Sequence, residues 1–363
     1  MIRRKGQDNV VVVGGYGAVG RTVCTELAQR FPGRVFAAGR NMRKAEAFSE
    51  ETGGRVLPLK LDMTDLSDAA KALDGARVVV ACAETGDIGF ARACLERGIH
   101  YVDISASYGF LSKIERLDAL ARRRGATGVL SVGLAPGLTN LLASRCARML
   151  DSVRSLDISV LLGLGEAHGE AAVRWTVENL DARFTVPGVP ETVGSLEDPR
   201  TVLFPGEYGR RTTYRFDFSD QHVLARTLGV EKVATRLCFD SATATRLLAL
   251  ARRAGAFRAL KSRWARDALV ALLSRLRLGS DGFSVKVEAE GAVDGYPGTY
   301  SGSVSGRGEG YATGIVAASV AERLYAAPCE RGVLHIEQLF EASAMFDQIT
   351  AHGLTVVLDP PPG

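Results

Sequence analysis

The sequence predicts an α/β fold, namely a Rossmann-type doubly wound parallel sheet accompanied by a second, α+β domain. Three observations support this expectation. Short apolar runs alternate with helical spacing through the first 150 residues, a glycine-rich turn follows the first run, and the alternation stops near Leu150. Apolar runs of this kind are typical of strands covered by helices on both faces. At 363 residues, the chain also exceeds the size at which one core usually stops growing.

The first half of the chain supplies the parallel strands. The expected strands are Val10–Val13, Arg34–Ala38, Val56–Leu61, Ala76–Cys82, His100–Ile104 and Thr127–Val132. Between them, apolar residues recur every three or four positions, as in Val19, Val23, Leu27 and Phe31. Strand and helix therefore alternate, which is the pattern of crossover connections between parallel strands.

The middle of the chain predicts a different arrangement, because strands and helices no longer alternate strictly. The expected strands are Asp157–Leu162, Thr212–Phe218, Val233–Phe239, Phe283–Ala289 and Thr299–Ser305, with a turn at Asp294-Gly295. The expected helices are Glu170–Leu180 and two within Thr243–Leu278. An amphipathic helix is predicted at Tyr311–Tyr325, followed by a short tail.

Composition narrows the class of protein. Apolar residues make up 46% and charged residues 24% of the chain, which is ordinary for a globular protein. The net charge of +4 is the remainder of 45 basic and 41 acidic residues, and the basic runs are short, as in Arg122–Arg124. We interpret that run as a solvated helix end and expect no nucleic-acid partner.

The cysteines and the lengths of the apolar runs indicate the cellular compartment of the protein. The six cysteines form no C-x-x-C pair and no metal-ligand spacing, so we expect reduced thiols and no metal. No apolar run reaches membrane-spanning length, and the run after Met1–Lys5 is too short for a signal peptide. We therefore expect a cytoplasmic protein with no membrane partner.

The strongest motif is G-x-G-x-x-G at Gly15, Gly17 and Gly20, between a strand and a helix. We expect Gly15 to make a tight turn, Gly17 to let the main chain approach a pyrophosphate, and Gly20 to let the helix pack on the strand. The helix N-terminus then faces the anion. The predicted dinucleotide-binding turn comprises Gly15, Tyr16, Gly17, Ala18, Val19 and Gly20.

The end of the second strand favours NADP(H) over NAD(H). An NAD-binding chain usually has a carboxylate there to bind the ribose hydroxyls, whereas this chain has Arg40 and Asn41. Arg40 can form two hydrogen bonds to a 2′-phosphate, although it could also simply face solvent. Asp62 and Met63, at the end of the third strand, are expected to flank the adenine.

The carboxyl ends of the later strands are expected to surround the nicotinamide, because ligands of doubly wound sheets bind there. These ends are Cys82–Thr85, Asp103–Ser107 and Gly133–Gly137. Within them, Cys82, Ala83 and Ser105 are candidate cofactor contacts, Asp103 is a candidate catalytic group and Pro136 is a candidate substrate contact. Alternatively, each of these side chains could form hydrogen bonds only with main-chain groups of its own loop.

A polar segment of the second domain is expected to face the substrate. Glu166 and His168 lie in a loop that enters a helix carrying Arg174 and Trp175. His168 is a candidate general acid, because the pKa of an ordinary histidine lies near neutrality, and Glu166 is a second candidate. Arg174 and Trp175 are candidate substrate contacts. The alternative for His168 is an ordinary polar loop residue.

Several segments resemble the saccharopine dehydrogenase-like family. They are the opening Val10–Gly20, the Tyr-x-Asp element in Gly98–Asp103 followed by Ser105, the turn Gly133–Asn140, and the stretch Gly310–Ala321. The resemblance implies a Rossmann domain at 1–150 plus 309–363, interrupted by an α+β substrate and dimerisation domain at 151–308. It also implies a homodimer, formed through an exposed face of the second domain's sheet. Many relatives that act on amino acids continue Tyr-x-Asp with Gly-Glu, whereas this chain has Ser105-Ala106-Ser107, which argues against saccharopine itself as the substrate.

The sequence therefore predicts an NADPH-dependent oxidoreductase. The expected reaction is reduction of a C=N or C=O bond in a small polar substrate derived from an amino acid. Two alternatives remain open: reduction of an activated C=C bond, which requires an apolar pocket, and a non-catalytic protein that senses NADP. The chain has no Tyr-x-x-x-Lys, H-E-x-x-H or G-x-S-x-G motif, so short-chain dehydrogenase, metalloprotease and α/β-hydrolase chemistry are not expected.

Overall fold

The computed structural model describes residues 8–84, 86–166, 169–274 and 279–359. Contacts divide the chain into two compact units. Unit 1 comprises Met1–Gly133 and Thr313–Leu339, and unit 2 comprises Leu134–Ala312 and Phe340–Gly363. Compared with the expected ranges, residues 134–150, 309–312 and 340–363 group with unit 2. As functional domains, the ranges remain a prediction.

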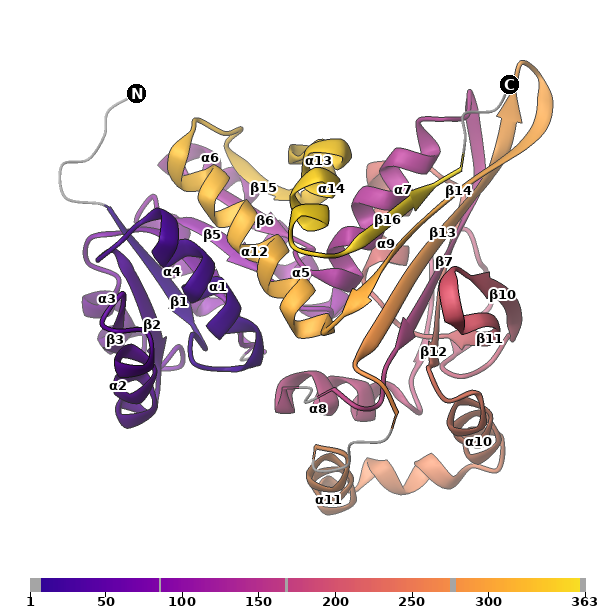
Figure 1. Cartoon of the computed structure of the whole chain (residues 1–363), viewed down its shortest axis with the longest axis horizontal. Helices are drawn as coiled ribbons and strands as arrows, with labels where there is room; N and C mark the ends of the chain where they lie inside the picture. The colour runs from indigo at the N-terminus through magenta and orange to yellow at the C-terminus, as the bar shows by residue number, and fades with distance from the viewer. Residues whose placement is uncertain (1–7, 85, 167–168, 275–278, 360–363) are drawn as a thin grey trace. The chain divides into compact units, whose positions relative to one another are not determined.

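Unit 1 is built on a seven-stranded sheet in the order β15-β6-β5-β4-β1-β2-β3 (Figure 1). All neighbouring strands are parallel. The bounds are β1 Asn9–Val13, β2 Val35–Gly39, β3 Val56–Lys60, β4 Ala76–Ala81, β5 His100–Asp103, β6 Thr127–Leu130 and β15 Gly332–His335. The six predicted strands are confirmed, together with the predicted Rossmann-type sheet. The order reverses beside β1, which is where ligands bind in such sheets.

The helices of unit 1 connect these strands. Their bounds are α1 Ala18–Arg30, α2 Met42–Glu51, α3 Leu66–Ala72, α4 Gly89–Glu96, α5 Tyr108–Glu115, α6 Asp118–Arg124 and α13 Ile336–Leu339. Helices α3 to α6 bury residues such as Phe90, Leu95 and Leu111 in one apolar cluster with the sheet. This cluster is the core on which one layer of helices rests.

Helix α12, at Glu309–Ala326, corrects two expectations. We predicted an amphipathic helix, but nearly every residue from Ala312 to Ala321 is buried, because small side chains let neighbouring elements approach. A Cβ at Gly314 would lie 2.5 Å from the Cβ of Thr22 on α1. The expectation of a short tail was also wrong, since α12 is followed by β15, α13, α14 (Ala342–Ala351) and β16 (Thr355–Leu358).

Unit 2 contains a mixed seven-stranded sheet in the order β10-β11-β12-β7-β13-β14-β16. The bounds are β7 Ser152–Leu162, β10 Arg200–Phe204, β11 Gly209–Arg215, β12 Lys232–Phe239, β13 Gly282–Val293 and β14 Tyr296–Arg307. Figure 1 shows β7, β13 and β14 as long adjacent strands. The predicted turn is confirmed: Asp294 and Gly295, with φ of 51° and 79°, join β13 to antiparallel β14.

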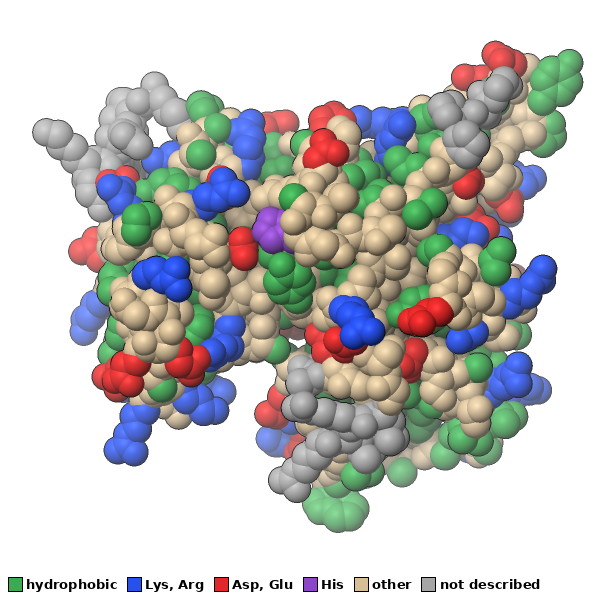
Figure 2. All heavy atoms as spheres, viewed as in Figure 1, with side chains coloured by type: hydrophobic (Ala, Val, Ile, Leu, Met, Phe, Trp, Pro, Cys, Tyr) green, Lys and Arg blue, Asp and Glu red, His purple; other side chains and the backbone are tan. Residues whose placement is uncertain are grey.

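The other elements of unit 2 lie outside this sheet. They are the segment Leu134–Leu138, helices α7 Thr139–Ala147, α8 Glu170–Asn179, α9 Asp220–Thr227, α10 Ala242–Arg253 and α11 Arg263–Leu273, and the short strands β8 Arg183–Phe184 and β9 Val193–Gly194. The predicted α+β character of this region is confirmed. On the face that Figure 2 shows, basic and acidic side chains are interspersed. No helix among the described residues is long and apolar enough to span a bilayer.

Candidate functional site

The register of the unit 1 sheet brings the predicted cofactor residues to one edge. Val13 is the partner of Ala38 on β2 and of Ala81 on β4, and Ala81 is the partner of Asp103 on β5. The residues after these four positions therefore leave the sheet side by side. They begin the glycine turn, the Arg40 segment, the Cys82 segment and the Ser105 segment.

The glycine turn is shaped by close main-chain packing. Gly14, with a φ of +75°, makes the turn that we had expected at Gly15. A Cβ at Gly15 would lie 2.7 Å from Ala37 Cα, and one at Gly20 would lie 2.2 Å from Gly14 O. A Cβ at Gly17 would meet Gly14 O at 3.1 Å, a milder contact. Gly15 and Gly20 are thus required by the fold itself.

Gly17 also begins α1 without a side-chain cap. Its N–H donates to Gly14 O at 2.8 Å. The N–H groups in the first turn of a helix have no acceptor within that helix and carry partial positive charge. Ala18, Val19 and Gly20 supply three of these groups, so the turn presents main-chain donors suited to a pyrophosphate. The residues present therefore fit a dinucleotide.

Tyr16 and Asn41 tie the glycine turn to the end of β2. The Tyr16 hydroxyl accepts a hydrogen bond from the Asn41 N–H at 3.0 Å. The Tyr16 ring covers Gly39, where a Cβ would lie 2.4 Å from the Tyr16 hydroxyl oxygen. The Asn41 side chain accepts from the Lys44 N–H at 3.2 Å and thereby caps α2. Arg40, between these contacts, is exposed at the start of α2, where cation and helix N-terminus both favour an anion.

Asp62 and Met63 lie at the end of β3 but differ in exposure. Asp62 Oδ1 accepts from the Thr64 N–H at 2.9 Å and from the Thr64 hydroxyl at 2.7 Å. These bonds, with a smaller contribution from the Arg40 charge, lower the pKa of Asp62. Met63 is 7% exposed and packs in the core cluster. The side chain of Met63 is therefore buried, and Asp62, which is less buried, is the better candidate for the adenine side.

The Cys82 segment follows β4 at the same edge. The Cys82 N–H donates to Val13 O at 2.9 Å, which joins it to the end of β1. Burial and the nearby Asp103 charge raise the pKa of the Cys82 thiol to about 12, so this cysteine stays protonated at neutral pH. Ala83 is exposed, and the Ser105 hydroxyl donates to the Glu84 carboxylate. Thr85 lies outside the described residues.

Asp103 is the centre of a buried hydrogen-bond network. Its side chain accepts from the Tyr101 hydroxyl at 2.6 Å and from the Ser105 N–H at 2.8 Å, and the residue is 2% exposed. Burial raises the pKa of Asp103 to about 6, although both hydrogen bonds act in the opposite direction. The network holds the Ser105 segment at the cofactor edge. The catalytic role of Asp103 stays a prediction.

The raised pKa of Asp103 has a measurable consequence for stability. The folded chain binds more protons than the unfolded chain between about pH 4 and pH 6, so the free energy of unfolding falls as pH rises through that window. In the wild type, we expect the free energy of unfolding to fall by about 3 kcal/mol across this window because of Asp103, and we expect Asp103→Asn to remove that fall. Urea unfolding of both proteins from pH 4 to 7 measures the difference. If the free energies of unfolding of the two proteins changed in parallel with pH, the raised pKa of Asp103 would be contradicted.

Glu166 holds the N-terminus of α12. Its carboxylate accepts from the Glu309 N–H at 2.6 Å and from the Gly310 N–H at 2.9 Å. A carboxylate in this position satisfies free amides and complements the helix dipole. The structure thus gives Glu166, predicted as catalytic, a capping role. His168 lies outside the described residues and stays a prediction.

Glu166→Ala should lower the free energy of unfolding by about 1 kcal/mol, as expected for the loss of a helix cap. Thermal unfolding measures this change. Glu170→Ala is the matched control, because that side chain is 74% exposed and its ion pair with Arg174 is a surface pair of small value. Unchanged stability in Glu166→Ala, together with lost turnover, would favour the catalytic role instead.

The predicted substrate contacts are engaged within unit 2. Arg174 pairs with Asp267 at 2.6 Å and with Glu170 at 3.2 Å, which joins α8 to α11. The ring of Trp175 packs against Phe216 and Phe218, with centroids 5.5 and 5.0 Å apart. Pro136 is buried within Leu134–Leu138. Phe216 and Phe218 are buried, so these contacts of Trp175 are part of the packing of unit 2.

Sequence reasoning missed a polar cluster between β11 and α9. His222 Nε2 lies 2.7 Å from Asp217 Oδ1, and Arg215 donates to the Gln221 side chain at 2.9 Å. Burial raises the pKa of Asp220, which accepts from the Thr235 hydroxyl at 2.6 Å. His222 is 8% exposed. The only signal in the sequence was the density of polar residues in Asp217–His222, which matches no motif.

The fold and the cofactor edge fit an NADP-dependent oxidoreductase. Residues 10–129 match the family model described as saccharopine dehydrogenase NADP binding domain. Residues 10–129 are therefore similar to the NADP-binding domain of that family, as the resemblance predicted, and the cofactor is NADP(H).

One solved structure shares this fold over nearly the whole chain. The structure of apo saccharopine dehydrogenase (L-Glu forming) from Saccharomyces cerevisiae is 16% identical, with 97% of this chain and 100% of that chain covered and a TM-score of 0.67. The C. glutamicum DAP dehydrogenase is more distant, at 11% identity and a TM-score of 0.47, with 92% of this chain and 94% of that chain covered. An engineered D-amino acid dehydrogenase bound to NADP+ is 13% identical over the same shares, with a TM-score of 0.45.

Proposed function

We propose that this protein uses NADPH to reduce a C=N or C=O bond in a small polar substrate derived from an amino acid. The observation that carries the proposal is the fold match over the full length of the Saccharomyces cerevisiae protein, whose name states that it forms L-Glu. The NADP-binding family domain at residues 10–129 supports the cofactor half of the reaction. Saccharopine itself is not the substrate proposed, because Ser105-Ala106-Ser107 replaces the Gly-Glu pair.

The chain must supply a proton as well as a place for the cofactor. NADPH supplies a hydride to the carbon of the bond, and a proton must then reach the nitrogen or oxygen. His168 remains the predicted donor. His222 is a second candidate, because Asp217 lies within hydrogen-bond distance and can hold its ring in one orientation. In this proposal, Asp103 holds the cofactor segment and transfers no proton.

A coupled screen tests this function. Purified protein is incubated with NADPH and pairs of an amino acid and a 2-oxo acid, and loss of absorbance at the NADPH band is followed. Turnover with such a pair, or with a carbonyl compound alone, supports the proposal. His168→Asn and His222→Asn are then compared for the basic limb of the pH profile. NADPH binding without turnover of any substrate would favour the NADP-sensing alternative.

One observation favours the second candidate function, reduction of an activated C=C bond. This reaction requires apolar surroundings for the substrate, and the partly exposed ring of Trp175 rests on the buried rings of Phe216 and Phe218 in unit 2. Arg174 is held in two ion pairs, which reduces its value for binding a carboxylate. A parallel screen with 2-enoyl substrates separates the two functions, because only one class of substrate should consume NADPH.

The proposal extends to a cytoplasmic homodimer. The free cysteines of the described chain support a reducing compartment. Large apolar side chains are exposed on α10 and α11, among them Leu250 at 58% and Trp264 at 80%. A partner surface is a more favourable environment for them than water. These residues lie on helices rather than on the sheet face expected from the family. Light scattering of the wild type and Trp264→Glu tests the dimer.

A further inference from the structure

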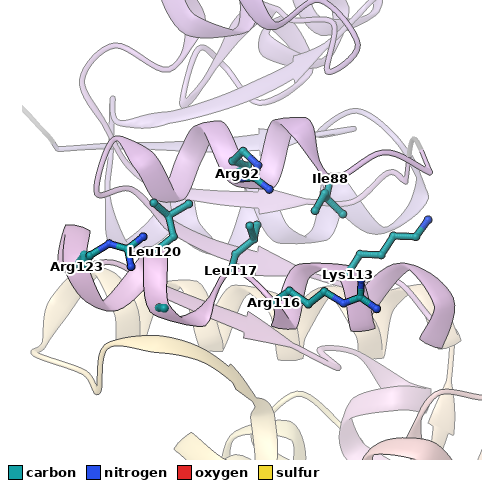
Figure 3. A pocket seen from close by; sticks show the side chains of 8 residues that line it. Ile88, Arg92, Lys113, Arg116, Leu117, Leu120 and Arg123 are labelled. Atoms are coloured by element: carbon teal, nitrogen blue, oxygen red, sulfur yellow. The ribbon is translucent and has the colours of Figure 1, made fainter.

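An open pocket of about 350 Å³ lies on unit 1, where α4, α5 and α6 meet (Figure 3). Its floor is apolar, because Leu117 is 3% exposed within the core cluster and Leu120 packs against that cluster. Its cationic lining consists of Arg92, Lys113, Arg116 and Arg123. None of the predicted cofactor residues lines it. The pocket is therefore separate from the site already described.

Arg92 lies on α4, Lys113 on α5 and Arg123 on α6, and Arg116 directly follows the end of α5. Figure 3 shows Arg92 facing Leu117 and Leu120 across the pocket, with Arg123 and Lys113 at opposite ends. Among the described residues, no ion pair engages any of the four. Arg122 provides a contrast on α6, since it pairs with Asp118 at 2.9 Å and with Glu330 at 3.8 Å. Arg123, the next residue, is left available for an external anion.

The volume and lining indicate the class of ligand. A volume of about 350 Å³ is within the range of small-molecule sites, about 300 to 1,000 Å³. Guanidinium groups bind phosphate oxygens through paired hydrogen bonds. An apolar floor beneath several cations fits a molecule that joins phosphates to an apolar ring. A nucleic acid would instead require a longer, continuous basic track than these four side chains provide.

We propose that this pocket binds a phosphorylated small molecule of the nucleoside polyphosphate class. The phosphates are bound by Arg92, Lys113, Arg116 and Arg123, and the base covers Leu117 and Leu120. This inference goes beyond the proposed function. It requires neither a particular substrate nor turnover.

Calorimetric titration with magnesium-free ATP tests the proposal, and the fluorescence of bound NADPH is followed in parallel. We expect saturable ATP binding that leaves NADPH bound. Arg123→Glu and Arg116→Glu should each weaken ATP binding by about tenfold, as for loss of one charge-assisted contact. Arg124→Glu is the matched control, because Arg124 is exposed on the same helix and does not line the pocket. It should change ATP affinity by less than about twofold.

Further titrations separate the parts of the ligand. Inorganic tripolyphosphate should bind more weakly than ATP. Leu120→Ser should weaken the binding of ATP while leaving the binding of tripolyphosphate unchanged. Three results would overturn the proposal: no saturable ATP binding, equal losses in Arg123→Glu and Arg124→Glu, or displacement of NADPH by ATP. Binding of a short single-stranded oligonucleotide but not of ATP would point to nucleic acid and would also overturn it. Circular dichroism of each variant confirms that these surface changes leave the fold intact.

Discussion

Gly20→Ala should abolish NADPH binding and lower the free energy of unfolding by about 3 kcal/mol, the upper end of the usual cost of overpacking. The added methyl group would lie 2.2 Å from Gly14 O, and that oxygen belongs to main chain that cannot rotate away. The start of α1 would have to move away from β1. Such a movement would displace the amides that bind the pyrophosphate.

Two glycine variants make this result specific. Gly17→Ala meets Gly14 O at 3.1 Å, so we expect weaker NADPH binding with a much smaller change in unfolding free energy. Gly109→Ala on α5 meets nothing within 4 Å and should be neutral or stabilising, as alanine is in helices. Urea unfolding and calorimetric NADPH titration measure the two quantities separately. A Gly20→Ala protein with wild-type stability would contradict the packing that we describe.

Arg40→Asp is expected to raise the dissociation constant for NADPH by about 30-fold, or about 2 kcal/mol, while leaving NADH binding nearly unchanged. Arg40 is exposed at the end of β2, directly before the N-terminus of α2. The variant removes a cation that can bind the 2′-phosphate and places a carboxylate beside it. NADH has no phosphate at that position, so its binding does not depend on this charge.

The measurement is a parallel titration with NADPH and NADH, in which the fluorescence of the bound nicotinamide is checked by calorimetry. Arg124→Asp carries the same charge change on α6 and should leave the preference for NADPH intact. If Arg40→Asp kept the full preference, another group would have to bind the 2′-phosphate. The nearby Arg43 and Lys44 on α2 would then be tested in the same way.

Local patterns in the sequence were sufficient for most of unit 1. The apolar runs predicted six of its seven strands, since an interior parallel strand must be apolar on both faces. The seventh, β15, is four residues long and follows α12 by only a short connection, so no repeating pattern identified it. Register then aligned the strand ends, which is why Gly15, Arg40, Cys82 and Ser105 could be predicted at one edge.

The substrate-side residues could not be assigned in this way, because a side chain's partner is rarely nearby in sequence. Glu166 resembles a catalytic acid in the sequence, yet the structure shows it capping α12, more than 140 residues later. Arg174 resembles an anion-binding residue, yet Asp267 neutralises it. Conversely, His222 and Asp217 form a pair that no sequence motif predicted.

The sequence by itself determined six strands of the unit 1 sheet, the glycine-rich segment that follows the first of them and the choice of NADP(H), because each depends on a periodic pattern or on residues within a short segment. Only the tertiary structure decided which polar groups meet. His335, for example, lies 2.8 Å from both the Ser131 hydroxyl and the Glu115 carboxylate, although the chain positions differ by 204 and 220 residues. Hydrogen bonds and ion pairs act over about 3 to 4 Å, so they depend on packing rather than on distance along the chain.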